Sequence, residues 1–290
     1  MASDENEAAN VSALLITFND EYSLAICLDS LLRQSFGQII VVDGGSTDRT
    51  VEIAADFDCV EVVSSTLGMK AQSIEGSRFL KHEFVFVAEA DHVYPDGFIK
   101  LLLREFLESE LNGLQAKLHR ENPSGFFERG HSAFLRLHNQ ASGRRDVIAC
   151  PQIWRTRDWL ALLNHTHDGE RFSFDTERGE AARRLGLTVG VGTVAATEGG
   201  DADFSRFVKR HRNYGLGDVD FLLGNWSRWS WGRRVQSLSH VPRTYFSKYP
   251  LLALRSGESL ETVGYLILIG LFRYVFFLHG LLKRMFSNHK

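Results

Sequence analysis

Residues 85–95 form an apolar run that stops on two carboxylates one residue apart, Glu89 and Asp91. An apolar run bounded by polar residues is typical of a buried strand in a parallel sheet, and ligands of open α/β sheets bind where such strands end. Side chains two apart on an extended backbone point the same way. Oxygen ligands suit Mg²⁺ or Mn²⁺, often together with substrate phosphates. The run therefore predicts a metal site, with a solvated loop as the alternative.

Two earlier segments repeat the strand-and-turn pattern. Val11–Phe18 is a predicted strand, and Asn19-Asp20 can cap the helix that follows. That helix carries a leucine face at helical spacing: Leu24, Leu28, Leu31 and Leu32.

The next predicted strand, Gln38–Val42, runs directly into the turn Asp43-Gly44-Gly45-Ser46-Thr47-Asp48. The glycines allow a tight turn and close approach of a ligand, and Ser46 or Thr47 can cap a helix through Phe57. The chain has no G-x-G-x-x-G after its first strand and no G-x-x-x-x-G-K-[ST], so neither a dinucleotide fingerprint nor a P-loop is present.

In this order, the segments 17–20 (TFND), 41–48 (VVDGGSTD) and 89–91 (EAD) resemble the family 2 glycosyltransferases of the GT-A fold. The resemblance implies that the first two segments hold the nucleobase and ribose of a nucleoside-diphosphate sugar, and that the third holds a metal and the pyrophosphate. It assigns donor binding to Thr17, Asn19, Asp20, Asp43, Gly44, Ser46 and Glu89, and the metal to Asp91 and Glu89.

Residues 68–76 are similar to the G-x-x-x-Q-x-x-x-G segment of one branch of that family, which adds Gln72 to the donor site. Many relatives carry Arg-Asn here, and this chain does not. The first position of the D-x-D motif is Glu89, while the last, Asp91, is the carboxylate that the family most often uses on the metal.

Residues 174–177 (FDTE) and 183–186 (RRLG) are similar to the family's E-D…R…G segment. By its distance to Gly186, Asp175 takes the position of the base that deprotonates the acceptor, and Glu177 is the alternative. A carboxylate suits this work. Asp175 is also compatible with a plain helix N-cap.

Residues 210–218 resemble the R-x-x-x-Y-G-x-G segment of related transferases. The resemblance assigns Arg210, Arg212 and Tyr214 to a clamp around the pyrophosphate and the acceptor ring. A basic, solvated helix face is the alternative.

Alternating strand and helix patterns over 290 residues predict an α/β fold. We expect a disordered tail over 1–10, a GT-A domain with a mostly parallel sheet over 11–225, and a basic, apolar helical extension over 226–290. Three scattered cysteines and a polar N-terminus favour reduced cytosol over secretion.

Charge is unevenly distributed. From Ser227 onward, ten Lys or Arg stand against two Glu, a balance of +8 in a chain of net charge −3. Residues 263–282 are strongly apolar but contain Arg273, which is costly in lipid. These features predict an interfacial helix with a snorkelling Arg273 on an anionic membrane. A terminal helix packed on the sheet or in a homodimer is the alternative. No nucleic-acid-binding motif is present.

The resemblance implies a hexosyltransferase, and the charge and apolar pattern of the C-terminal region predict that it is peripheral at the cytoplasmic face of the membrane. It would invert the sugar while moving it from a UDP-sugar to a hydroxyl of a glycan or lipid-linked acceptor, with Mg²⁺ or Mn²⁺. An inactive nucleotide-sugar-binding module is one alternative, because Glu89 replaces Asp and Phe174 precedes Asp175. A sugar-1-phosphate nucleotidyltransferase would need a G-x-G-x-R loop, and residues 17–21 have none.

Overall fold

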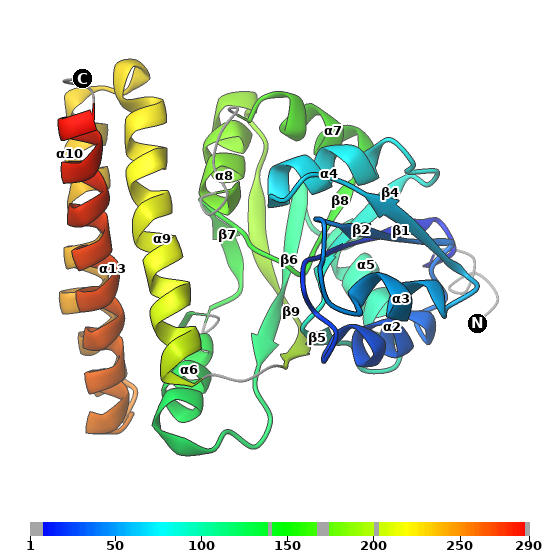
Figure 1. The fold of residues 1–290 in the computed structure, drawn as a ribbon, viewed down its shortest axis with the longest axis horizontal. Helices are drawn as coiled ribbons and strands as arrows, with labels where there is room; N and C mark the ends of the chain where they lie inside the picture. Colours follow the sequence, from blue (N-terminus) through cyan, green and yellow to red (C-terminus); the bar gives the residue numbers. More distant parts are fainter. Residues whose placement is uncertain (1–7, 139–140, 167–173, 200–202, 288–290) are drawn as a thin grey trace. The chain divides into compact units, whose positions relative to one another are not determined.

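The computed structural model describes residues 8–138, 141–166, 174–199 and 203–287. These residues form two compact units (Figure 1). Unit 1 comprises 8–121, 141–166 and 174–199, and unit 2 comprises 122–138 and 203–287. The division differs from the expected boundary at residue 225, because the helices over 125–138 and 204–225 belong with the C-terminal helices. The predicted tail lies mostly outside the described residues, and Ala8 is buried.

Unit 1 is built on a sheet in which the structure describes nine strands in the order β3-β2-β1-β4-β8-β6-β9-β5, with β7 paired to β9. The strands are β1 Val11–Thr17, β2 Gln38–Asp43, β3 Val60–Ser64, β4 Phe84–Glu89, β5 His92–Val93, β6 Gly113–His119, β7 Gly143–Arg145, β8 Gln152–Arg155 and β9 Val189–Glu198.

The α/β prediction is confirmed, with a correction to the strand directions. The strands β1 to β4 pair in parallel, as do β6 and β9. The strand β8 runs antiparallel to both β4 and β6, and β9 runs antiparallel to β5 and β7. The sheet is therefore mixed, because the second half of unit 1 joins β4 through the antiparallel strand β8.

Helices cover both faces of this sheet (Figure 1). They are α2 Leu24–Leu32, α3 Thr50–Ala55, α4 Met69–Ser77, α5 Phe98–Glu108, α7 Thr156–Asn164 and α8 Phe174–Leu185. Alternate residues of β1 enter opposite cores: Ala13 and Leu15 pack with α2 and α5, whereas Leu14 and Ile16 pack with α7 and α8. This two-residue period is the one expected for a strand buried on both faces.

Helix α4 lies directly on the sheet because Gly76 has no side chain. A Cβ at Gly76 would lie 2.4 Å from Leu14 Cδ1 and 2.5 Å from Val42 Cγ2. The close approach places the first turn of α4 at the ends of β1 and β2.

Two predicted helix caps are wrong. The Asp20 carboxylate accepts from Thr17 Oγ1 at 2.8 Å and from Phe18 N at 2.9 Å, so it closes the loop before α2 instead of capping the helix. Ahead of α3, the Asp48 carboxylate accepts from Thr50 N at 3.0 Å. Ser46 and Thr47 lie too early to cap α3, because its first residue is Thr50.

Unit 2 is helical in its described residues. Its helices are α6 Gly125–His138, α9 Phe204–Asn225, α10 Trp231–Leu238, α11 His240–Arg243, α12 Tyr249–Arg255 and α13 Leu260–Ser287, with short 3₁₀ and π turns at Trp226–Arg228 and Thr244–Lys248. Helix α13 packs on α9 and α6. At Gly215 of α9, a Cβ would lie 2.4 Å from the Arg273 carbonyl oxygen, so the two helices touch backbone to backbone.

Among the described residues, Leu260–Arg284 is the one helical stretch long and apolar enough to cross a membrane, judged by length and composition alone. The predicted snorkelling of Arg273 is wrong. Its guanidinium forms a two-pronged ion pair with the Asp218 carboxylate of α9, at 2.6 and 2.7 Å, and donates to Tyr245 Oη at 3.2 Å. The Asp218 carboxylate neutralises the Arg273 guanidinium inside unit 2, so the side chain does not extend to solvent.

Candidate active site

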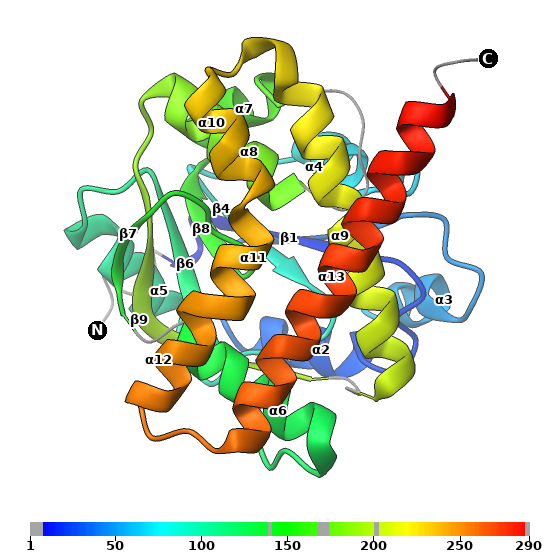
Figure 2. The same ribbon diagram turned by 90° about the vertical axis from the view of Figure 1, so that its left-hand side faces the viewer.

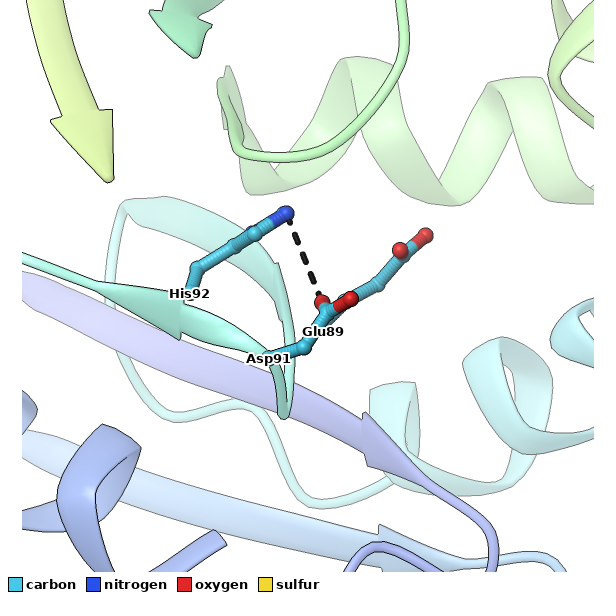
Figure 3. Close-up of side chains that lie close together, drawn as sticks. All are labelled: Glu89, Asp91 and His92. Atoms are coloured by element: carbon cyan, nitrogen blue, oxygen red, sulfur yellow. Dashed lines mark ion pairs between the residues drawn. The ribbon is translucent and has the colours of Figure 1, made fainter. Parts of the chain in front are cut away.

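The acidic residues at the end of β4 form the densest cluster of possible metal ligands among the described residues. Glu89 is the last residue of β4, Asp91 follows in the turn, and His92 opens β5. One ligand atom from each lies within 4.8 Å of the other two. Figure 3 shows the Asp91 carboxylate between the His92 ring and the Glu89 side chain, with His92 Nε2 3.6 Å from Asp91 Oδ1. The predicted pair is thus brought together, and His92 is an addition that the strand pattern did not indicate.

Negative charge is concentrated around Glu89. Partial burial, followed by the charges of Asp91, Asp175 and Glu198, raises the pKa of Glu89 to about 8, and Arg178 opposes the shift. Carboxylates this close repel one another when ionised, so some of them retain their protons unless a cation binds between them. At neutral pH Glu89 therefore holds a proton that a bound cation would displace.

The cluster fits a divalent cation. Asp91 Oδ1 is buried and accepts no hydrogen bond in the part of the chain that the structure describes. A buried oxygen without a hydrogen bond is costly, and a cation would satisfy it. Two carboxylates and an imidazole form a donor set that Mg²⁺ or Mn²⁺ accepts.

Two further carboxylates reach the cluster from other elements. Burial raises the pKa of Asp20 in the loop after β1, and the negative charge of Asp91 adds to this effect. Glu198, the last residue of β9, is buried and lies opposite His92 in the β5–β9 pairing. Sequence reasoning missed Glu198. The sequence shows Glu198 only as an acid at the end of an apolar run. That pattern does not reveal the antiparallel pairing of β9 with β5, which brings Glu198 to the cluster.

Helix α8 brings the predicted base to the same cluster. Asp175 lies in the first turn of α8, and its side chain is 36% exposed. It forms an ion pair with Arg178, one turn later. The negative charge of Asp175 contributes to the raised pKa of Glu89, so the Asp175 carboxylate lies near the acid cluster, whereas Glu177 is buried. The geometry therefore favours Asp175 over Glu177 as a group facing the acid cluster.

Arg178 is a second residue that sequence reasoning missed. Its side chain is only 3% exposed, and its guanidinium lies 4.9 Å from the Phe174 ring centre and 5.5 Å from the Trp159 ring centre. Stacking on two rings while paired to a carboxylate fixes a guanidinium firmly. The i, i+3 spacing from Asp175 was a usable signal.

At the end of β2, the predicted donor residue Asp43 is engaged by its own turn. Its carboxylate accepts from Gly45 N at 2.9 Å, from Ser46 N at 3.0 Å and from Ser46 Oγ at 2.5 Å. Gly45 has φ +86°, which its lack of a side chain permits. The Asp43 side chain thus shapes the turn 43–48.

The loops after β1 and β2 are joined into one edge. Asn19 N donates to Ser46 Oγ at 2.8 Å, and Thr47 N donates to Asn19 Oδ1 at 2.8 Å. Asn19 adopts a left-handed backbone, with φ 57°, a conformation that Asn tolerates better than most residues. The two motifs that the resemblance assigned to the nucleoside therefore form a single hydrogen-bonded surface.

Gln72 supports this edge from beneath. Its amide nitrogen donates to the carbonyl oxygens of Thr17 at 2.8 Å and Val42 at 2.9 Å, and the side chain is buried. A Cβ at Gly44 would lie 3.1 Å from the Gln72 amide. The predicted donor residue Gln72 thus ties the ends of β1 and β2 together, and Gly44 provides the space for it.

The three predicted clamp residues lie on α9 of unit 2. Arg210 Nη1 lies 3.0 Å from His131 Nε2. The Tyr214 ring contacts Arg273, whose guanidinium lies 5.3 Å from the ring centre. Arg212 is exposed. These three residues belong to unit 2, whereas the acid cluster belongs to unit 1.

Several solved glycosyltransferase structures share this fold. Residues 1–349 of S. aureus TarS match at a TM-score of 0.52 and 15% identity, over 97% of this chain and 92% of that one. TarS in complex with UDP-GlcNAc matches at a TM-score of 0.53 and 18% identity, over 82% of this chain and 73% of that one. A third match is glucosyl-3-phosphoglycerate synthase from Mycobacterium tuberculosis in complex with Mn²⁺, UDP and glucosyl-3-phosphoglycerate. Its TM-score is 0.53 and its identity 14%, over 74% of this chain and 82% of that one. At these identities the likeness establishes the fold.

The comparison with curated protein sequences found no match. The sequence model of glycosyl transferase family 2 matches residues 12–170, more than half of the chain. The match includes the strand ends that carry Asp20, Asp43 and the acid cluster at Glu89 and Asp91. The chain belongs to glycosyl transferase family 2.

Proposed function

We propose that this glycosyltransferase moves a sugar from a UDP-sugar to an acceptor hydroxyl, on a glycan or a lipid-linked molecule, with a divalent cation held at the end of β4. The observation that carries the proposal is the cluster of Glu89, Asp91 and His92, in which one buried Asp91 oxygen has no hydrogen-bond partner among the described residues. Asp91 would hold the cation, with Glu89 as the second carboxylate. When bound, Mg²⁺ or Mn²⁺ supplies positive charge to the donor's phosphate oxygens.

The nucleoside of the donor is proposed to bind on the edge formed by residues 17–20 and 43–48. The mutual hydrogen bonds of Asn19, Ser46 and Thr47 support this proposal because they hold the edge in one conformation before any ligand arrives. A pre-formed surface loses less conformational entropy on binding. The effect of the Asp91 charge on Asp20 indicates that this edge adjoins the acid cluster.

Asp175 is proposed as the general base. It would take the proton of the acceptor hydroxyl as that oxygen attacks the anomeric carbon. The bond from that carbon to the diphosphate oxygen would break, and the nucleoside diphosphate would leave with the electron pair. A single displacement of this kind inverts the anomeric centre. The ion pair to the stacked Arg178 would hold the Asp175 carboxylate in one orientation, which general-base catalysis requires.

A catalytically inactive nucleotide-sugar-binding module is the second candidate, because Glu89 stands where most relatives have Asp and Phe174 where they have Glu. The two candidates differ in one measurable respect. An active transferase hydrolyses its donor slowly when water replaces the acceptor, whereas a binding module does not.

The experiment is a panel of UDP-sugars incubated with the full chain and Mn²⁺, with the released UDP measured by mass spectrometry. We expect hydrolysis of at least one donor, abolished by EDTA and by Asp91→Asn. Asp96→Asn is the matched control, since Asp96 lies close in sequence but pairs with Arg33 on the surface. Equal turnover with EDTA would overturn the metal role. UDP binding without turnover of any donor would favour the binding module.

A further inference from the structure

The helix α13 is apolar on two opposite sides. Its inner side packs on α9, where Gly280 of α13 lies against Leu216 and Val219. Its outer side bears a stripe of exposed apolar residues at spacings of four, four, three and four. This outer stripe consists of Ile267 (42% exposed), Leu271 (49%), Val275 (52%), Leu278 (40%) and Leu282 (53%). At 1.5 Å per residue it runs for roughly 22 Å.

The neighbouring helices α10 to α12 extend this apolar surface. Helices α11 and α12 contact α13, and α10 contacts α11, all within unit 2 (Figure 2). Gly270 of α13 lies against Tyr245 and Phe246. Their exposed apolar side chains are Trp231 (70%), Val235, Leu238, Phe246, Leu251 and Leu254. We call this set, together with the outer stripe, the α10–α13 face. Exposed apolar side chains gathered on neighbouring helices mark an interaction site.

The exposed charges of this layer that lack an acidic partner among the described residues are basic. Arg243, Lys248 and Arg255 are exposed and have no acidic partner in the described chain. The two acids of the layer are already neutralised from α6: Glu258 pairs with Arg136 at 3.0 Å and Glu261 with Arg129 at 2.7 Å. The surface therefore presents apolar side chains beside uncompensated positive charge.

The ion pair of Arg273 fixes how α13 can meet a bilayer. Its partner Asp218 lies on α9, and both side chains are largely buried. If α13 spanned a bilayer, this pair and the polar helix α9 would have to enter the hydrocarbon, which is costly. If α13 lay flat, only the outer stripe would enter, and the pair would remain inside unit 2.

We propose that the α10–α13 face rests on an anionic lipid surface, with α13 lying in the plane of the interface. Apolar side chains beside basic ones are what such a surface selects, and the cytoplasmic leaflet is anionic. A second copy of this chain is a poorer occupant. A symmetric dimer through the face would bring its uncompensated basic residues toward their own copies. The inference goes beyond the proposed function, because it requires neither donor nor acceptor.

The test is co-sedimentation of the full chain with vesicles, in the absence of donor and metal. Vesicles of phosphatidylcholine alone are compared with vesicles containing about one third phosphatidylglycerol. We expect sedimentation with the anionic vesicles, weakened by high salt because exposed charges are screened. Trp231 is 70% exposed, so its fluorescence should be quenched by brominated acyl chains, and Trp231→Phe should reduce that quenching.

The decisive variant replaces Leu271, Val275 and Leu278 with Gln. We expect vesicle affinity to fall by at least about tenfold, since the apolar part of interfacial binding scales with buried area. The matched control replaces three exposed apolar residues of unit 1, Ile26, Leu101 and Leu107, with Gln and should bind as the parent does. Circular dichroism and UDP binding verify that both variants fold.

Three outcomes would overturn the proposal. The full chain could remain in the supernatant with both vesicle types, or the triple Gln variant could bind vesicles as tightly as its parent. The full chain could also form a dimer that the triple Gln substitution disrupts, which would assign the face to a second copy. Because vesicle binding is measured without turnover, a failure here is distinguishable from a failure of the transferase proposal.

Discussion

The strands β2 and β4 both lead to a carboxylate at the same edge of the sheet, but the two carboxylates have different surroundings. Asp43 accepts three hydrogen bonds from the turn that follows it. Within the described part of the chain, Asp91 keeps one buried oxygen without a hydrogen bond and lies among other acids. A satisfied carboxylate stabilises its own loop, whereas a crowded, unsatisfied one is prepared for a positively charged ligand. The same residue type after a similar strand thus shapes a turn in one place and, in the proposed function, holds a cation in the other.

Replacing Asp91 with Asn should have the largest effect. We expect kcat/KM to fall by about 10³-fold, because the amide removes the charge that binds the cation. The metal-free variant should be no less stable than the parent, since Asp91 repels Glu89. Steady-state kinetics and thermal melts measure the two effects. A variant that is unstable but active when folded would show that Asp91 resembles Asp43 after all.

Replacing Asp175 with Asn should lower kcat by at least about 10²-fold while leaving UDP affinity unchanged, because a base acts only in the chemical step. Single-turnover kinetics and calorimetry separate these quantities. Glu177→Gln is the control, and it should retain activity if it folds. If Glu177→Gln loses turnover and Asp175→Asn does not, the base is assigned to the wrong residue of α8.

The raised pKa of Glu89 predicts a pH dependence of metal affinity. With a pKa of about 8, Glu89 holds a proton at lower pH that the cation must displace. Affinity for Mg²⁺ should therefore fall by up to about tenfold for each pH unit below 8. Calorimetry between about pH 6.5 and pH 8 tests this, and Glu89→Gln should flatten the profile. An equally steep profile in Glu89→Gln would assign the proton to another group.

Replacing Asp43 with Asn should have the smallest effect and of a different kind. The amide NH₂ that replaces one carboxylate oxygen is a hydrogen-bond donor, and it would face the N–H and O–H donors of the turn. We therefore expect the free energy of unfolding to fall by about 1 kcal/mol. Metal affinity should not change, because Asp43 is committed to its turn. Chemical denaturation and metal calorimetry on the same variant provide the two readings. Loss of metal affinity with unchanged stability would reverse the comparison between the two strand ends.

The sequence predicted those parts of the site that depend on local pattern. Strand ends at Asp43 and Glu89 follow from apolar runs that stop on polar residues, and the pairing of Glu89 with Asp91 follows from the two-residue period of an extended chain. Asp175 was located by resemblance to a family segment. These features involve neighbours within a few residues, where spacing alone fixes which side chains can meet.

The remaining features depend on contacts between distant segments. Glu198 reaches the cluster only because β9 runs antiparallel to β5. Gln72 joins two strand ends across the sheet, so its motif alone suggested donor contact and not support. Arg273 was expected to snorkel, since the sequence pattern could not indicate that its partner is Asp218, which lies 55 residues earlier on another helix. No local pattern encodes these pairings.

The most direct test of the central claim is a crystal of the full chain grown with Mn²⁺ and UDP, with data collected at the manganese absorption edge. We predict one strong anomalous difference peak at the end of β4, bound by an Asp91 oxygen, and no peak at Asp43. UDP bound on the edge formed by residues 17–20 and 43–48 without a manganese peak near Asp91 would contradict the account.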